Sequence, residues 1–268
     1  MNIVLWVTII MIIMIYSVCK LRKPKVVNNL PLCKRLQNSD KKIPKKIMLT
    51  TANKDTIPSH IIEQYNIYAS DYDITIFDDA DCVAFLKREY HADVLNKFKS
   101  LEAGAHKADL FRYAYLLKHG GIYLDIKTIL IRNLNELINH ESFLCYLVIT
   151  ENSPMVYNGI LCTPPENPIF LALLTDILYG SPLTYYLQYC FSAMLILKSF
   201  ITNCTRGFHH SIRDDVPDVI LWYESFFDES FCNGQRDRHG HCTFITDQHN
   251  AKIIQVRDTT YGKPNGWI

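Results

Sequence analysis

Three charged side chains stand inside apolar stretches near the middle of the chain. Asp109 and Arg112 lie in "ADLFRYAYLL", and Asp125 lies in "GIYLDIKT". Burying a charge is costly unless another charge or a ligand compensates for it. A guanidinium binds phosphate oxygens and a carboxylate accepts hydrogen bonds from hydroxyls, so a polar, phosphate-bearing ligand would give each charge a partner. The simpler alternative for Asp109 and Arg112 is an ion pair that only stabilises a helix.

Two local elements must position these side chains. Apolar residues at helical spacing predict a helix that Ser100 caps and that Gly120 and Gly121 end. "IYLDI" then predicts a buried strand. The spacing puts Asp109 and Arg112 on one helical face and places Asp125 on the same strand face as the tyrosine two residues before it. A carboxylate at the C-terminal end of a strand in an open α/β sheet lies where ligands bind.

Strands alternate with helices in the rest of the first half, which predicts an α/β fold. Pro44 precedes the first strand, and Pro58 occupies the first turn of the first helix. The expected elements are strands at 45–49 and 72–79, helices at 57–70, 81–90, 167–179 and 186–201, and a hairpin over 244–258 with its turn at 249–251.

The segment "KADLFRYAYLLKHGGIYLDIKT" closely resembles the signature of glycosyltransferase family 32, and more distantly the clostridial glucosylating toxins. The family pattern is an Ala-Asp-x-x-Arg-Tyr helix, a Gly-Gly-x-Tyr-x-Asp turn and strand, and a second Asp two residues later. "IPKKIMLT" is similar to the family's opening strand, and "YNGILCTPPENPIF" to a later region. The resemblance implies a GT-A fold, a Rossmann-like mixed sheet flanked by helices. It also implies a UDP- or GDP-sugar donor and retaining transfer of a hexose to a glycan, lipid or protein acceptor.

The resemblance also assigns roles to particular residues. Asp109 and Arg112 would bind the donor sugar, with Arg112 also near the diphosphate, and Asp125 would hold the sugar or ribose and reach a metal ion. The donor-binding set that the resemblance implies is Asp109, Arg112, Gly120, Gly121, Tyr123, Asp125 and Trp267. For Trp267, packing of a hydrophobic tail on the core is an equal alternative.

Lys127 departs from the family pattern, because it stands where the second Asp of the D-x-D motif would ligate a divalent cation. In one arrangement Lys127 turns outward, and Asp125 holds Mn²⁺ or another divalent cation with a later residue such as Asp258 or Asn265. In the other, the Lys127 ammonium takes the cation's place and acts in catalysis by neutralising the departing diphosphate. The first arrangement is favoured. Lys127 is also the feature that favours the alternative function, a catalytically inactive relative that binds a nucleotide sugar or a glycan.

The N-terminal residues differ from the rest in composition. Residues 1–19 are almost entirely apolar and predict a single-pass membrane anchor, with a cleaved signal peptide as the rival. Residues 20–42 are basic and predict a tether, followed by one catalytic domain at 43–268. The lysines after the apolar run favour a cytosolic domain, whereas family relatives often face the Golgi or endoplasmic reticulum lumen, so the orientation stays open.

The remaining chemistry-bearing segments support simpler readings. Lys and Arg number 28 against 27 Asp and Glu, which gives no reason to expect nucleic acid as a partner. The segment from Cys232 to Cys242 predicts a surface loop with a possible disulfide better than a zinc site. His209-His210 predicts an exposed loop, and Asp78-Asp79 a turn at a strand end.

Overall fold

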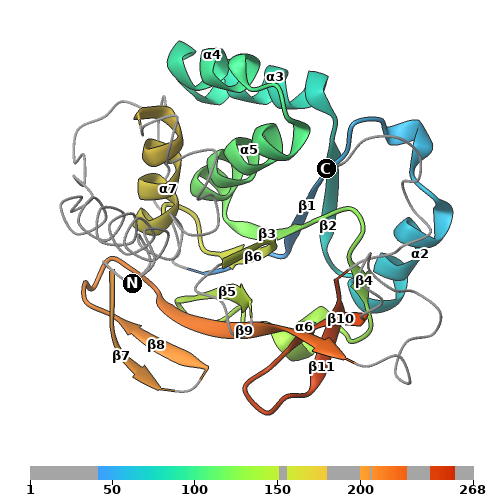
Figure 1. Ribbon diagram of the computed structural model, residues 1–268, viewed down its shortest axis with the longest axis vertical. Coiled ribbons are helices and arrows are strands. Elements are labelled where there is room, and N and C mark those ends of the chain that lie inside the picture. Colours follow the sequence, from blue (N-terminus) through green and yellow to red (C-terminus); the bar gives the residue numbers. More distant parts are fainter. Residues whose placement is uncertain (1–41, 151–155, 180–199, 206, 228–241, 257–268) are drawn as a thin grey trace, which may run out of the picture.

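A computed structural model describes residues 42–150, 156–179, 200–205, 207–227 and 242–256. Within these residues the strands form one mixed sheet in the order β2-β1-β3-β6-β5-β9-β10-β11-β4, with β7 and β8 attached to β9 (Figure 1). The sheet bends strongly, so that the short strand β4 pairs with β11 at its far end. The α/β class expected from the sequence is confirmed.

The first half of the sheet is parallel at its edge and antiparallel toward its middle. β1 pairs in parallel with β2 and β3, and β3 pairs antiparallel with β6. Parallel pairing orders β1, β2 and β3 with their C-terminal ends on one side, the side at which Asp125 follows β3. The elements of this half are β1 (Lys46–Thr50), β2 (Asp73–Phe77), β3 (Gly121–Leu124), β4 (Ile129–Leu130), β5 (Leu144–Thr150) and β6 (Val156–Thr163).

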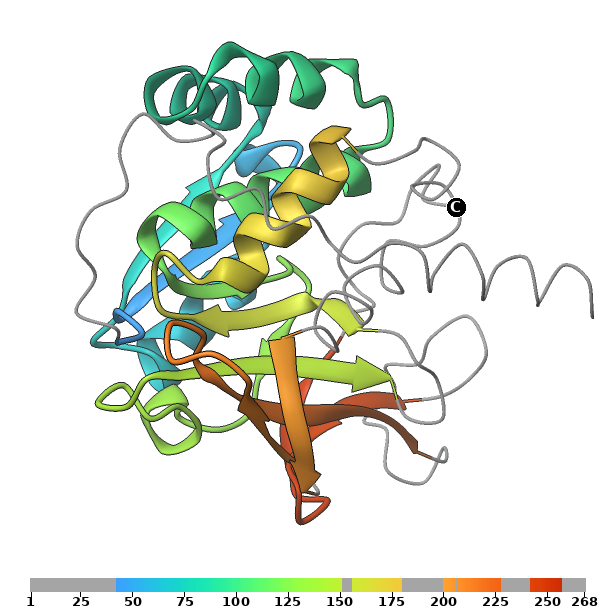
Figure 2. The ribbon, with the colours of Figure 1, turned by 90° about the vertical axis from the view of Figure 1, so that its left-hand side faces the viewer.

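Helices cover both faces of the sheet and separate two hydrophobic clusters (Figures 1 and 2). One cluster packs α3, α4, α5 and α7 over one face, and the other packs α2 and α6 against the opposite face. The bounds are η1 (Lys54–Thr56), α2 (Ser59–Tyr68), α3 (Asp79–Glu89), α4 (Ala92–Ser100), α5 (Gly104–His119), α6 (Leu134–Leu137) and α7 (Pro168–Tyr179).

The second half adds strands that the sequence did not predict. β5 pairs in parallel with β9 over seven residue pairs, and β9 continues antiparallel into β10. The expected hairpin is confirmed as β10 and β11, joined by the turn at 247–251. The bounds are β7 (Ile201–Thr205), β8 (Phe208–Ser211), β9 (Asp218–Phe227), β10 (Cys242–Thr246) and β11 (Lys252–Gln255).

Three local predictions are wrong. Ser100 does not cap the central helix: it ends α4, and its hydroxyl donates to the Lys97 carbonyl at 2.8 Å instead. His209 and His210 lie in β8, where pairing with β7 and β9 overrides their loop-like composition. Asp78 caps α3 in a reciprocal capping box, so that helix starts two residues earlier than expected.

Some predictions fall outside the described residues. These are the membrane anchor, the basic tether up to residue 41, Cys232, the metal-ligand candidates Asp258 and Asn265, and Trp267. The expected helix at 186–201 falls there except for its last two residues, of which Ile201 begins β7. Cys242 is disulfide-bonded.

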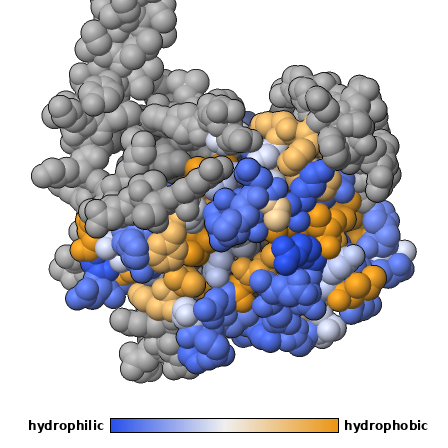
Figure 3. Space-filling model, turned by 90° about the horizontal axis from the view of Figure 1, so that it is seen from below, coloured by the Kyte–Doolittle hydropathy of each residue, from blue (hydrophilic) through white to orange (hydrophobic). Residues whose placement is uncertain are grey.

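No helix among the described residues is long and apolar enough to span a bilayer. The face of the molecule seen from below mixes hydrophilic residues with smaller hydrophobic patches (Figure 3).

Candidate active site

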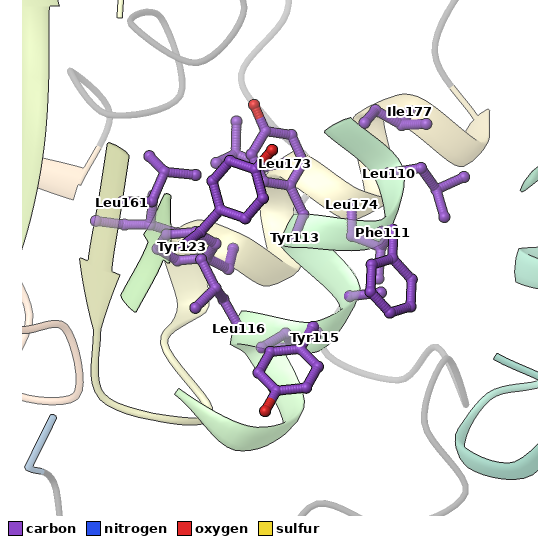
Figure 4. Packing of buried hydrophobic residues seen from close by; sticks show 14 of the residues in the cluster. Leu110, Phe111, Tyr113, Tyr115, Leu116, Tyr123, Leu161, Leu173, Leu174 and Ile177 are labelled. Carbon is purple, nitrogen blue, oxygen red and sulfur yellow. The ribbon is translucent and has the colours of Figure 1, made fainter. Parts of the chain in front are cut away.

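The helix α5 carries two of the predicted site residues through the centre of the domain. Every residue from Asp109 to Lys118 is buried, so α5 has no solvent-facing side in this stretch. Its apolar side chains pack against α7 and the sheet, with Tyr113, Leu116 and Leu173 around the ring of Tyr123 (Figure 4). A helix enclosed in this way fixes its charged residues firmly, because they cannot rotate out into water.

Asp125 follows the last residue of β3 and begins a tight turn. Its backbone N–H donates to the Gly159 carbonyl at 2.8 Å, and its own carbonyl accepts from the Thr128 N–H at 2.8 Å. The side chain is 40% exposed, whereas that of Arg112 is only 6% exposed. Asp125 is thus the point at which the buried charge group reaches the surface.

The guanidinium of Arg112 brings the predicted residues together. It lies 3.3 Å from a carboxylate oxygen of Asp109 and 3.7 Å from one of Asp125. It also stacks over the Tyr123 ring, 4.2 Å from the ring centroid. The predicted convergence of one guanidinium and two carboxylates is confirmed. The i, i+3 ion pair is present, and Arg112 also meets Asp125, which comes from another element.

Two strands fix the orientation of this group through contacts that the sequence did not reveal. The Tyr123 hydroxyl donates to Asp125 Oδ1 at 2.6 Å and lies 3.2 Å from the Thr50 hydroxyl at the end of β1. Nη1 of Arg112 donates to the Asn158 carbonyl, and Nε donates to the Ala108 carbonyl at 3.1 Å. Backbone carbonyls leave no trace in residue types, so only the Asn-Gly pair in "YNGILC" could have drawn attention to β6.

Asn158 adds a buried polar side chain beside this group. The residue is 7% exposed, and neither atom of its side-chain amide makes a hydrogen bond of ordinary geometry in the described part of the chain. The amide is nevertheless near enough to Asp109 to lower that residue's pKa. An amide that offers both a donor and an acceptor suits a ligand hydroxyl.

The electrostatics of the site follow from its burial. Burial raises the pKa of Asp109 to about 6, although the Arg112 guanidinium acts in the opposite direction. Burial also holds the pKa of the Tyr123 hydroxyl well above its usual value. Tyr123 therefore keeps its proton and can donate it in the hydrogen bond to Asp125.

Gly120 and Gly121 are not brought to the charged group. Gly120 precedes β3 and Gly121 is its first residue, so both lie at the strand end opposite Asp125. Both have positive φ, 63° and 101°, and a Cβ on Gly120 would lie 2.5 Å from the Pro165 nitrogen. The glycines are thus required by the turn and its close packing against other backbone.

Lys127 lies in the turn that Asp125 begins, between β3 and β4. The residues present in the described chain do not fit a divalent cation. They include no group of three or more His, Cys, Asp or Glu side chains that could hold a metal ion. Asp125 is the one carboxylate of the motif, its Oδ1 already accepts a hydrogen bond from the Tyr123 hydroxyl, and the Lys127 ammonium has no lone pair to offer.

A separate cavity of about 340 Å³ lies on the other face of the sheet, and it shares none of these residues. Its lining includes the aromatic residues Tyr146, Trp222 and Phe208, with Arg132 and Glu136 among its polar residues. Tyr146 and Trp222 belong to the cluster beneath α2 and α6, whereas Tyr123 belongs to the cluster around α5. The cavity is therefore distinct from the charged group.

Comparisons with known proteins agree with the geometry. Residues 41–144 match the family model described as a glycosyltransferase sugar-binding region containing a DXD motif. The chain is 31% identical over 86 residues to an uncharacterized glycosyltransferase of Acanthamoeba polyphaga mimivirus, covering 32% of this chain and 34% of the relative. It is 30% identical over 139 residues to a mannosyl phosphorylinositol ceramide synthase of Saccharomyces cerevisiae, covering 50% of this chain and 35% of the relative.

Each of these matches covers only part of this chain and part of the relative. A second mannosyl phosphorylinositol ceramide synthase of the same yeast is 32% identical over 108 residues, which cover 40% of this chain and 27% of the relative. The chain thus spans about a third of the length of these relatives. Among solved structures it is similar to PaToxG glycosyltransferase, with a TM-score of 0.43 and 15% identity over 59% of this chain and 69% of that chain, too weakly to support a conclusion.

The matched region contains the helix, the glycine turn, β3 and the D-x-K turn, which are the elements that form the charged group. The resemblance to glycosyltransferase family 32 is confirmed as a similarity: residues 41–144 match the model of a glycosyltransferase sugar-binding region containing a DXD motif.

Proposed function

We propose that the protein is a glycosyltransferase of the GT-A type that moves a hexose from a nucleotide-sugar donor to a glycan, lipid or protein acceptor. The observation that carries this proposal is the convergence of Asp109, Arg112 and Asp125 at the C-terminal end of β3. In an open α/β sheet this is the end at which ligands bind. Three charges at a largely buried site are costly unless a ligand compensates for them. A sugar diphosphate would do so, because its phosphate oxygens accept from the guanidinium and its hydroxyls donate to the two carboxylates.

The proposed roles follow from which atoms remain available. Arg112 is held by two carbonyls and a tyrosine ring, so its fork has one fixed direction in which to meet the diphosphate. Asp109 and the Asn158 amide would bind hydroxyls of the hexose. Asp125 is partly exposed, so it can bind the sugar or the ribose. It would do so through Oδ2, because its Oδ1 already accepts a hydrogen bond from Tyr123.

In the proposed reaction the bond between the anomeric carbon and the diphosphate oxygen breaks, and its electron pair leaves with the diphosphate. The acceptor hydroxyl oxygen forms the new bond to that carbon with retained configuration, and its proton passes to the departing diphosphate. The departing diphosphate carries negative charge that the site must stabilise. Arg112 supports the same charge without leaving its position.

The names of the yeast relatives indicate which donor to test first. They are called mannosyl phosphorylinositol ceramide synthases, so mannose is the first hexose that we propose for this chain. A lipid acceptor would agree with the apolar residues 1–19, which we propose to be a single-pass membrane anchor. Identifying the acceptor would also indicate whether the domain faces the cytosol or the lumen of the Golgi or endoplasmic reticulum.

The test is a panel of UDP- and GDP-sugars, GDP-mannose included, assayed for donor hydrolysis and for transfer. We expect one donor to be turned over, and Asp109→Asn and Arg112→Ala to lower the rate at least a hundredfold, because each removes a group that acts on the donor. Asp71→Asn is the matched control, since this carboxylate is exposed and pairs with Lys45 at the opposite end of β1. Equal activity of Arg112→Ala and wild type would refute the proposal.

The alternative function is a relative that binds a nucleotide sugar or a glycan without turnover. Lys127 favours it, because the motif lacks its second carboxylate. The same panel separates the two. Saturable donor binding by calorimetry, with neither hydrolysis nor transfer in Mn²⁺ or in chelator, would establish the alternative.

A further inference from the structure

The charges of the D-x-K site balance without a metal ion. Asp109, Arg112 and Asp125 converge in this site, and Lys127 follows Asp125 by two residues in the sequence. These four residues carry two negative and two positive formal charges, which cancel. An aspartate at position 127 would leave a net charge of minus two, which a divalent cation would cancel. Replacing that aspartate by lysine therefore changes the site's charge by the same amount as binding a divalent cation.

The local geometry supports this equivalence. The hydrogen bond from the Thr128 N–H to the Asp125 carbonyl, 2.8 Å long, closes a four-residue turn, and this turn brings the backbone of Lys127 close to Asp125. A lysine ammonium sits on a flexible four-carbon stem, so it can follow a diphosphate bound at Asp125. The guanidinium of Arg112 lies 3.7 Å from a carboxylate oxygen of Asp125.

The same arrangement opposes a divalent cation. The ammonium at position 127 has no lone pair with which to ligate the ion, and it repels an ion placed nearby. The guanidinium of Arg112 adds a second positive charge, which is fixed in place. Within residues 42–150, 156–179, 200–205, 207–227 and 242–256, no cluster of acidic, His or Cys side chains offers other ligands.

We infer that Lys127, together with Arg112, takes the place of the divalent cation in this protein, so that the nucleoside diphosphate of the donor binds without a metal ion. This inference rests on the proposed function, since it assumes a sugar diphosphate in the site. The ammonium and the guanidinium pair with the diphosphate oxygens and stabilise the negative charge that remains when the bond to the anomeric carbon breaks.

Calorimetric titration of the full-length chain with UDP and with GDP tests the inference, in excess EDTA and in Mn²⁺. We expect the wild type to bind one of the two equally well under both conditions. Lys127→Ala should weaken that binding in EDTA by about tenfold to a hundredfold, because a charge-assisted contact is lost. Lys127→Arg should retain it. Lys127→Asp, which restores the D-x-D motif, should bind only when Mn²⁺ is present.

Lys42→Ala is the matched control, because this lysine is half exposed and pairs with Glu141, far along the chain from the D-x-K turn. Thermal melting of each variant without nucleotide checks that the turn still folds. Binding by the wild type that requires Mn²⁺ would overturn the inference and leave the proposed function standing. Failure of both UDP and GDP to bind under any condition would instead count against the proposed function itself.

Discussion

Asp109 is the most deeply buried carboxylate of the site, and burial raises its pKa toward neutral pH. Its exposed fraction is 7%, and burial raises its pKa to about 6. An acid with a raised pKa takes up a proton at a higher pH than usual, so Asp109 is ionised at pH 7 but mostly neutral at pH 5. Only the ionised form accepts hydrogen bonds from hydroxyls with both oxygens.

Donor affinity should therefore fall as the pH drops through about 6. If only ionised Asp109 binds the sugar, the dissociation constant at pH 5 should be about tenfold larger than at pH 7. Titrating the full nucleotide sugar and the nucleoside diphosphate alone at both pH values separates the sugar contact from other effects. A pH dependence of equal size for both ligands would contradict the role of Asp109 in holding the sugar.

Tyr123→Phe isolates the hydroxyl that orients Asp125. The phenylalanine ring keeps the stacking contact with Arg112 but loses the hydrogen bond to Asp125 Oδ1. We expect transfer to slow and donor binding to weaken by about fivefold, the effect of losing about 1 kcal/mol. Tyr65→Phe is the matched control, since that buried hydroxyl makes no hydrogen bond in the described chain and lies in the other cluster. Similar losses in both variants would show a general packing effect.

At the scale of elements, the turn between α5 and β3 determines whether the site can form. Gly120 ends α5 with a φ of 63°, and its N–H donates to the Leu116 carbonyl at 2.8 Å. The turn is packed so tightly against Pro164 and Pro165 that a side chain has no room. A substitution here would move β3 relative to α5, and with it Asp125 relative to Arg112.

Gly120→Ala should accordingly destabilise the domain by about 2–4 kcal/mol, through positive φ and overpacking together. Gly104→Ala, at the first residue of α5, is the control and should change stability by less than about 1 kcal/mol. Chemical denaturation of both variants measures the difference. A Gly120→Ala variant as stable as the wild type would show that the turn can relax.

The same elements show what sequence reasoning can and cannot supply. The α5 to Asp125 segment was predictable because its helix, glycine turn and strand are contiguous and their side chains carry the charge. The start of α5 was not, because Ser100 has the composition of a cap but lies at the end of a preceding helix that was not foreseen. The parallel pairing of β5 with β9 joins residues more than seventy positions apart, for which residue types give no local signal.

At the scale of the whole molecule, the membrane anchor at residues 1–19 remains a prediction. We expect the full-length chain to stay in the membrane fraction during alkaline carbonate extraction. Ile12→Lys should release it, since a charge in the middle of a span costs about 3 kcal/mol or more. Asn28→Lys, in the predicted tether, should leave fractionation unchanged. Retention of the Ile12→Lys variant would contradict a spanning anchor.

One consequence of the architecture concerns β6. Two successive peptide carbonyls of this strand, those of Asn158 and Gly159, accept from the guanidinium of Arg112 and from the backbone of Asp125. The strand β6 thereby fixes the distance between α5, which carries Arg112, and the turn that begins at Asp125. Inserting one residue ahead of Asn158 would reverse the faces of the side chains beyond it and misalign both partners. Such a shift in strand register would abolish activity although no residue proposed to bind the donor had been substituted.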